Sequence, residues 1–206
     1  MANSPISPAV ATRGIQLQLI APLRRPLPAA VVEPKGVVYT KRWVVELLLD
    51  LSGYCSDKNL VDSLAVEPAA GDGAFLGPII ERLVESCRNL GRSLSECQNS
   101  LIAYELDEES AARARTVAQN ILIHRGVRRP LAKRLAEAWV LNRDYLFDAD
   151  NRPADFIIGN PPYVRLEDIP EETASVYRNA YPTMRGRADL YVAFFEAALQ
   201  IGRAHV

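Results

Sequence analysis

Hydrophobic positions along the chain form short continuous runs that alternate with longer stretches of amphipathic spacing. The runs predict strands, which cover residues 61–67, 101–106, 138–143 and 154–158. The amphipathic stretches predict helices, which cover residues 41–51, 74–90, 108–125 and 189–200. Strands that alternate with helices are typical of βαβ units, so the pattern predicts an α/β fold with a parallel sheet.

The first 35 residues differ in composition from the rest. Six prolines interrupt them, which argues against a long helix and predicts an irregular leader over residues 1–35. The folded region is expected to begin at about Gly36, and Thr40 is placed to cap the first helix. The buried face of that helix is expected to consist of Val44, Val45, Leu47, Leu48 and Leu51.

Ligands of parallel sheets bind at the carboxyl ends of the strands, where this chain has unusual residues. Glu67 ends the first strand and is followed by Gly71 and Gly73, which allow a tight turn and a close approach to a ligand. An ordinary strand-to-helix turn is the alternative. A phosphate-binding loop would avoid the carboxylate and would have glycine where Leu76 stands. The loop therefore favours a cationic ligand without phosphate, such as S-adenosylmethionine.

The second and third strands also end in acidic residues. Glu105 could accept hydrogen bonds from both hydroxyls of a ribose, although a solvated acidic strand end is the alternative. Its separation from Gly71 exceeds the usual spacing of about 20 residues, and a loop over the polar residues 89–99 accounts for the excess. Asp144 could accept from the exocyclic amine of an adenine, with the aromatic Tyr145 beside it, or could simply be a turn or helix-cap residue.

Asn160, Pro161, Pro162 and Tyr163 follow the last strand. An exocyclic amine is a poor nucleophile because its lone pair is delocalised, and its two N–H groups need two acceptors when buried. The Asn160 side-chain oxygen and the Pro161 carbonyl can supply both. The prolines fix the backbone, and Tyr163 offers a flat face to a flipped-out base. A strand that merely ends in a Pro-Pro turn would explain the prolines but not their neighbours.

In this order, the motifs resemble the gamma-class amino-methyltransferases of restriction–modification systems, particularly the type IIG-like N6-adenine methylases. The resemblance covers about residues 36–200 and includes Gly36–Thr40 and Ala188–Glu196. It implies a Rossmann-like S-adenosylmethionine-dependent sheet and a site-specific DNA adenine methyltransferase. It also implies the roles of the site residues. The methionine end of the cofactor would be held by Tyr39 and Thr40 and surrounded by Glu67, Ala69, Gly71 and Gly73, the ribose would be bound by Glu105, and the cofactor adenine would be held by Asp144 and Tyr145. The target base would be bound by Asn160, Pro161, Pro162 and Tyr163.

Composition narrows the setting. Cys55, Cys87 and Cys97 form no CxxC pair and no zinc pattern with His124 or His205, so no metal site is predicted. Reduced thiols in a cytoplasmic protein are the simple interpretation. No apolar run reaches the roughly 18 residues of a membrane span, so no membrane contact is expected.

The net charge of the chain is −1, so its composition does not indicate the basic surface that is typical of DNA-binding proteins. Members of the family continue with further strands and a target-recognition region, so we expect the domain over 36–200 to be incomplete. Double-stranded DNA would be recognised mostly by a region outside residues 36–200. A cognate restriction endonuclease is a candidate partner. Residues 201–206 can be back-translated to resemble a common sequencing adapter, which suggests a non-native tail after Gln200; a native basic tail is the alternative.

Two other functions remain open at the level of sequence. Release-factor glutamine methyltransferases and some RNA base methyltransferases also use an Asn-Pro-Pro-Tyr loop, because an amide or another base amine poses the same geometric problem. A cofactor-binding fragment without activity is the second alternative, because four strands without the rest of the sheet leave an open edge.

Overall fold

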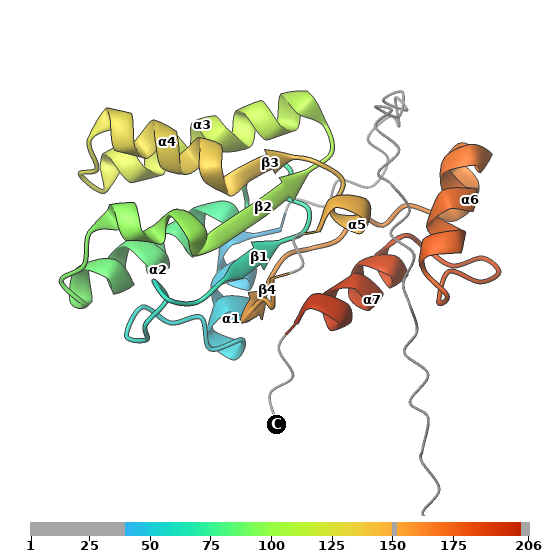
Figure 1. Ribbon diagram of the computed structural model, residues 1–206, viewed down its shortest axis with the longest axis horizontal. Coiled ribbons are helices and arrows are strands. Elements are labelled where there is room, and N and C mark those ends of the chain that lie inside the picture. Colours follow the sequence, from blue (N-terminus) through green and yellow to red (C-terminus); the bar gives the residue numbers. More distant parts are fainter. Residues whose placement is uncertain (1–39, 150–151, 203–206) are drawn as a thin grey trace, which may run out of the picture.

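Four short parallel strands form the centre of the fold (Figure 1). The computed structural model describes residues 40–149 and 152–202. The strands are β1 (Ala65–Glu67), β2 (Leu101–Glu105), β3 (Val140–Asn142) and β4 (Phe156–Ile157), in the order β3-β2-β1-β4. This arrangement confirms the predicted α/β class with a Rossmann-like parallel sheet. The expected leader over 1–35 and Tyr39 lie outside the described residues.

The register of the strands brings their carboxyl ends to one edge. Ala65 of β1 pairs with Leu101 of β2 on one side and with Phe156 of β4 on the other. Glu105 at the end of β2 pairs with Asn142 at the end of β3. The loops that follow all four strands therefore start at the same edge of the sheet.

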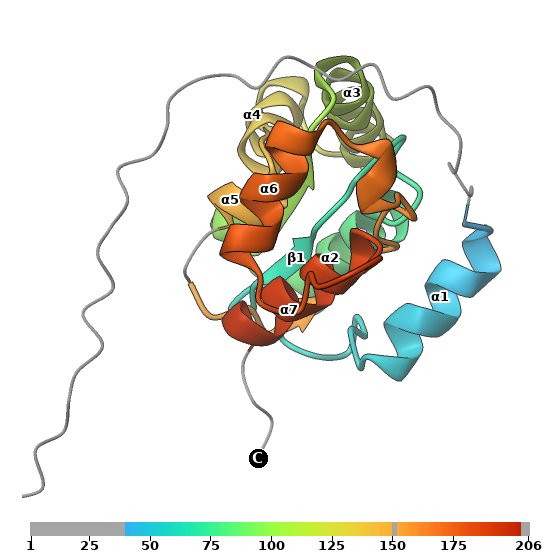
Figure 2. The same ribbon diagram turned by 90° about the vertical axis from the view of Figure 1, so that its right-hand side faces the viewer.

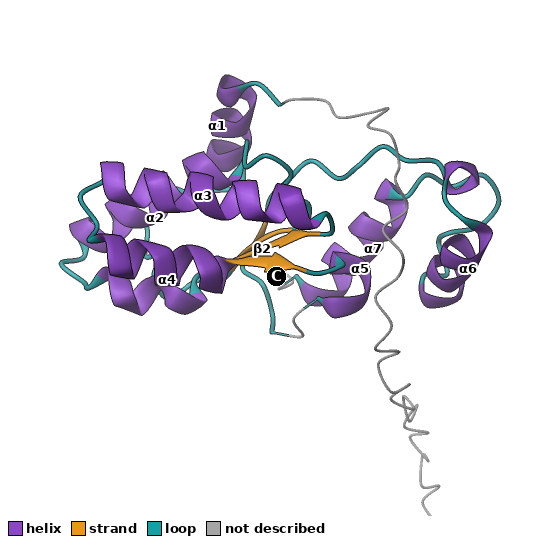
Figure 3. Ribbon diagram, turned by 90° about the horizontal axis from the view of Figure 1, so that it is seen from above, coloured by secondary structure: helices purple, strands orange, loops and turns teal. Residues whose placement is uncertain are grey.

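Alternate strand residues face two separate hydrophobic cores, as the two-residue period of a strand requires. Ala65, Leu101 and Ala103 belong to the core beneath the first group of helices, whereas Val66 and Ile102 belong to the opposite one. The first group is α1 (Arg42–Leu51), α2 (Leu76–Asn89), α3 (Glu108–His124) and α4 (Arg129–Trp139). The second is α5 (Tyr145–Asp148), α6 (Glu171–Ala180) and α7 (Tyr191–Ile201). Figures 1 and 3 show the two groups on opposite sides of the strands.

The predicted elements differ from the structure mainly around β1 and β3. The strand expected over 61–67 begins only at Ala65, because the preceding residues form turns. The strand expected over 138–143 is shortened because α4 runs to Trp139, whose buried indole Nε1 donates to the Cys97 carbonyl at 3.0 Å. The loop expected over 89–99 contains a 3-10 helix, η1 (Leu94–Asn99), capped by Ser93. Helices α4, α5 and α6 and a second 3-10 helix, η2 (Leu166–Asp168), were not predicted.

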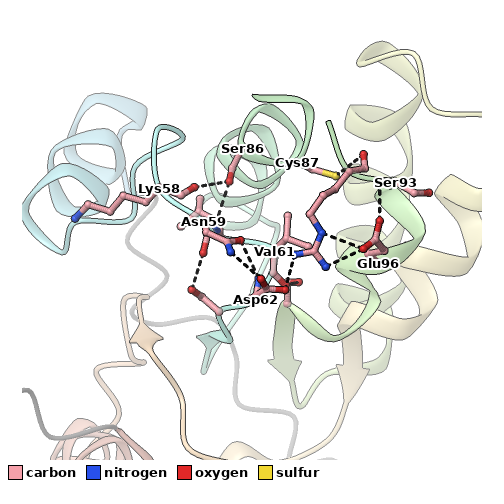
Figure 4. A network of polar contacts seen from close by, with 12 residues as sticks. Lys58, Asn59, Val61, Asp62, Ser86, Cys87, Ser93 and Glu96 are labelled. Carbon is pink, nitrogen blue, oxygen red and sulfur yellow. Dashed lines mark hydrogen bonds and ion pairs between the residues drawn. The ribbon is translucent and has the colours of Figure 1, made fainter. Parts of the chain in front are cut away.

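A network of polar contacts fixes the turns that lead into β1 (Figure 4). The hydroxyl of Ser86 on α2 donates to the Lys58 carbonyl at 2.5 Å and accepts from the Leu60 N–H at 3.1 Å. Arg92 forms an ion pair with Asp62 at 2.5 Å. Ser86 thus satisfies two backbone groups of a segment without regular structure, and the ion pair adds a side-chain contact, so the turns before β1 are held in place.

Helix α1 differs from the prediction in both its cap and its buried face. Its N-cap is Lys41, without a side-chain hydrogen bond, so Thr40 does not cap it. Val45 and Leu49 are the buried residues, and Leu47, Leu48 and Leu51, expected in the core, are exposed. Ion pairs with α2, among them Arg82–Glu46 at 2.7 Å, attach α1 to the domain beside this narrow buried face.

The chain returns to the sheet after α7. The Ala154 N–H donates to the Ile201 carbonyl at 2.8 Å, and Gly202 forms a parallel bridge with Ala154 beside β4. Of the expected non-native tail, residues 203–206 lie outside the described part of the chain. Within the described ranges, no helix is long and apolar enough to cross a membrane.

Candidate active site

The glycine loop after β1 is joined to the end of β2 by the carboxylate of Glu105. Oε2 of Glu105 accepts from the Gly71 N–H at 2.7 Å, and Oε1 accepts from the Asp107 N–H at 2.9 Å. The Ala70 N–H donates to the Tyr104 carbonyl at 2.8 Å. The structure thus brings together the first two predicted cofactor elements, which are 34 residues apart in sequence.

Both glycines of this loop are required by its backbone. Gly71 has φ of 51° and Gly73 has φ of 86°, in the left-handed region that side chains disfavour. A Cβ atom at Gly73 would also lie 3.3 Å from a methyl carbon of Val117 on α3. The turn can therefore close tightly, and the backbone from Ala69 to Gly73 lies at the carboxyl edge of the sheet.

Glu67 is a buried carboxyl group with an unsatisfied oxygen. It is 1% exposed, and its Oε2 has no hydrogen-bond partner among the described residues. Burial raises its pKa well above the ordinary value, and the negative charge of Glu105 raises it further. Orphaned buried acceptors are costly and uncommon in folded proteins. A cationic ligand at this edge would supply the missing partner.

The Asn160–Tyr163 loop lies against the glycine loop because Gly159 has no side chain. A Cβ atom at Gly159 would lie 2.9 Å from Cδ of Pro68, the residue that follows Glu67. The amide nitrogen of Asn160 donates to the Thr40 hydroxyl at 3.3 Å. Thr40 is therefore next to the motif predicted to bind the target base, and its hydroxyl contacts the nitrogen of the Asn160 side-chain amide.

Tyr163 ends this loop on the protein surface. Its ring is 57% exposed and lies 5.9 Å from the ring of Tyr191 at the start of α7. The Val164 carbonyl accepts from the Leu190 N–H at 2.8 Å, and Arg165 forms an antiparallel bridge with Asp189. These contacts bring the predicted motif around residues 188–196 beside the loop.

The end of β3 holds Asp144 and Tyr145 in different environments. Asp144 is half-buried and caps α5 by accepting from the Leu146 N–H at 2.9 Å. Burial raises its pKa, against the opposing effect of its hydrogen bonds. The Tyr145 ring, in contrast, lies in the core between Tyr104, at 5.5 Å, and Phe194, at 5.4 Å. The Tyr145 hydroxyl has no hydrogen-bond partner in the described part of the chain.

Tyr177 of α6 is a residue of this site that the sequence does not reveal. Its hydroxyl donates to Oδ2 of Asp144 at 2.8 Å, and its ring stacks on Phe147. It belongs to a helix that was not predicted, and its partner lies 33 residues away, so no local pattern marks it.

Comparison with known proteins identifies the family of the chain. Residues 87–205 match the family described as Eco57I restriction-modification methylase. The chain belongs to this family. It is 39% identical over 173 residues to the Type II methyltransferase M.XhoI of Xanthomonas vasicola, a match that covers 82% of this chain and 32% of that protein. It is 38% identical over 174 residues to the Type II methyltransferase M.BstVI of Geobacillus stearothermophilus, covering 81% and 31%.

A third relative is the Type II methyltransferase M.PaeR7I of Pseudomonas aeruginosa, which is 35% identical over 171 residues, or 82% of this chain and 30% of that protein. The chain thus spans about a third of the length of the curated relatives it matches.

Proposed function

We propose that the protein carrying this chain is a site-specific DNA methyltransferase of a restriction–modification system, which transfers a methyl group from S-adenosylmethionine to N6 of a flipped-out adenine. The observation that carries the proposal is the packing of Gly159 on Pro68, which places the Asn160 loop beside the orphaned carboxyl of Glu67. The proposed site for the target amine and the proposed site for the cationic cofactor would therefore be adjacent. Membership in a restriction-modification methylase family supports this assignment.

The described residues fit S-adenosylmethionine, which supplies an activated methyl group on a sulfonium. Glu67, with the backbone of Ala69, Gly71 and Gly73, would surround the charged methionine end, and Thr40 would lie beside it. The expected contact from Tyr39 lies outside the described residues. The orphaned Glu67 oxygen is what a positive charge and its N–H donors would satisfy.

Glu105 and the end of β3 would hold the nucleoside. Each oxygen of Glu105 accepts one backbone N–H, and a carboxylate oxygen has a second lone pair, so both oxygens can accept from ribose hydroxyls as well. Asp144 would accept from the adenine amine. Because the Tyr145 ring is packed between Tyr104 and Phe194, Tyr145 would contact the adenine from the core side, through the ring or through its hydroxyl. It would not stack on the adenine from the protein surface.

The target amine would meet two acceptors, the Asn160 side-chain oxygen and the Pro161 carbonyl. Each would accept a hydrogen bond from one N–H of the amine, and together they would favour a tetrahedral nitrogen with an available lone pair. Thr40 contributes by holding the amide nitrogen of Asn160, which leaves the oxygen to face the substrate. Pro162 restricts the loop, and the exposed ring of Tyr163 offers the face on which the base would stack.

Double-stranded DNA is the proposed substrate, and a cognate endonuclease remains a candidate partner. The net charge of −1 gives this part of the protein no general attraction for phosphates. The part of the relatives that lies outside the match is about two thirds of their length, and we assign most DNA contacts to the corresponding region.

The test uses the full-length protein with S-adenosylmethionine labelled in the methyl group, offered DNA, RNA and protein separately. We expect label in DNA. Asn160→Ala should abolish transfer while S-adenosylhomocysteine binding changes by less than about threefold, since Asn160 acts on the target amine. Asn179→Ala, at an exposed position of α6, is the matched control and should keep full activity. Label in protein or RNA but not in DNA would refute the proposal.

A further inference from the structure

Tyr177 connects the segment that follows the Asn160–Tyr163 loop to the end of β3. Its hydroxyl donates to Oδ2 of Asp144 at 2.8 Å, while Oδ1 of Asp144 accepts from the Leu146 N–H at 2.9 Å. Two donors on two different oxygens fix the plane of the carboxylate. Tyr177 is 4% exposed, whereas Asp144 is only half-buried, so Asp144 keeps accessible surface although its partner is covered.

The phenol is itself held in place. Its ring stacks on Phe147 of α5, with 5.0 Å between centroids and 9° between planes. One turn further on, the Tyr181 hydroxyl donates to the Leu146 carbonyl at 2.5 Å. Figure 2 shows α6 alongside α5. Tyr177 therefore approaches Asp144 in one orientation.

We infer that Tyr177 is a positioning residue that makes Asp144 selective for a purine with an exocyclic amine at position 6. The inference rests on the proposed function, because it takes the adenine of S-adenosylmethionine as the ligand of Asp144. Tyr177 touches neither the cofactor nor the target base in this account. It acts through the orientation and the charge of one carboxylate.

The selectivity follows from hydrogen-bond chemistry. An ionised carboxylate only accepts, so it binds the amine of adenine and opposes the oxygen of a 6-oxo purine. Burial and the nearby Asp148 raise the pKa of Asp144, while the hydrogen bonds from Tyr177 and Leu146 lower it. Removal of the Tyr177 hydroxyl takes away one of the two hydrogen bonds that lower the pKa of Asp144, so burial should raise that pKa further. It also frees the carboxyl group to rotate. A carboxyl group that protonates can donate to a 6-oxo purine, so discrimination should fall.

The test compares three ligands by calorimetry with the full-length protein: S-adenosylhomocysteine, its 6-oxo analogue and its analogue without a 6-substituent. Tyr177→Phe should weaken the binding of S-adenosylhomocysteine by about threefold to tenfold, which is the range expected for the loss of one hydrogen bond. The analogue without the substituent should change by less than about twofold. Tyr181→Phe is the matched control, because it removes a phenol hydroxyl between α6 and α5 that does not touch Asp144.

A merely structural role would weaken all three ligands equally, or would give Tyr181→Phe the same effect, and either result overturns the inference. A double-mutant cycle provides a second measurement. In the Asp144→Asn background, Tyr177→Phe should no longer alter discrimination, and a full effect there would also overturn it. Failure of the wild-type protein to bind S-adenosylhomocysteine would refute the proposed function and the inference together. Binding without the Tyr177 effect refutes the inference alone.

Discussion

Glu67 provides a direct connection between stability and ligand binding. Its carboxyl is fully buried at the end of β1, one oxygen has no partner among the described residues, and Glu105 adds a negative charge nearby. We predict that Glu67→Gln stabilises the ligand-free protein and weakens cofactor binding. The neutral amide keeps the shape of the side chain but removes the cost of a buried charge.

The magnitude has an upper limit, because the carboxyl can take up a proton instead of remaining a buried anion. For a glutamate with an ordinary pKa of about 4.3, protonation costs about 1.4 kcal/mol per pH unit, or roughly 3.7 kcal/mol at pH 7. The buried amide leaves part of its own hydrogen bonding unsatisfied, which offsets about 1–3 kcal/mol. We therefore expect a net gain in unfolding free energy of at most about 1–3 kcal/mol at pH 7.

The dependence on pH has a defined sign. The pKa of Glu67 is raised in the folded state, so the folded protein keeps a proton that the unfolded chain releases above about pH 4.3. The stability contributed by this group is complete below that pH and is lost as pH rises toward the folded pKa. Near pH 4.5 protonation costs only about 0.3 kcal/mol, so the unsatisfied amide should make Glu67→Gln less stable than the wild type. The difference should reverse as pH rises and favour Glu67→Gln at pH 7.

The assay is urea unfolding between pH 4.5 and 8, with and without S-adenosylhomocysteine. Binding to Glu67→Gln should weaken by about tenfold to hundredfold, the range of hydrogen bonds to a charged group. Glu137→Gln, in an exposed pair with Lys133 on α4, is the control and should change stability by less than about 0.5 kcal/mol. A variant that is less stable at every pH, or that binds the ligand as tightly as the wild type, would refute the reasoning.

Two further substitutions test the packing that supports the site. Gly159→Ala brings a Cβ to 2.9 Å from Pro68 and should cost about 1–3 kcal/mol of unfolding free energy, measured in urea. Gly77→Ala on α2, where the Cβ would meet the end of the Ile121 side chain at 3.3 Å, should stay within about 1 kcal/mol; equal losses would contradict the argument. Trp139→Phe leaves the Cys97 carbonyl without its indole donor and should lower the unfolding free energy by about 1–3 kcal/mol. The loss should be seen as a lower thermal midpoint. An unchanged midpoint would show that this bond contributes little.

The positions of the strands along the chain and the chemistry at their ends were predictable because both are local. Buried runs of apolar residues mark β2 and β4, and unusual residues follow them directly. Glu67 and Glu105 could be assigned to one edge from the rule that ligands bind at the carboxyl ends of parallel strands. The structure confirms that edge, and it adds the direct bond between Glu105 and Gly71.

The remaining features depend on contacts between distant segments. The α1 face was wrong because several apolar side chains, such as Leu47 and Leu51, are exposed, and the spacing alone cannot say which side meets the domain. Helix α4 carries a proline in its first turn, which marks a helix start as readily as a loop. Tyr177 could not be found at all, because only the fold brings it to Asp144.

The most direct test of the central claim is the chemical identity of the methylated product. DNA incubated with the full-length protein and S-adenosylmethionine is digested to nucleosides and analysed by mass spectrometry. We predict N6-methyladenine, in amounts that depend on Asn160. Methylation of cytosine instead, or unmodified DNA from a protein that binds the cofactor, would contradict it.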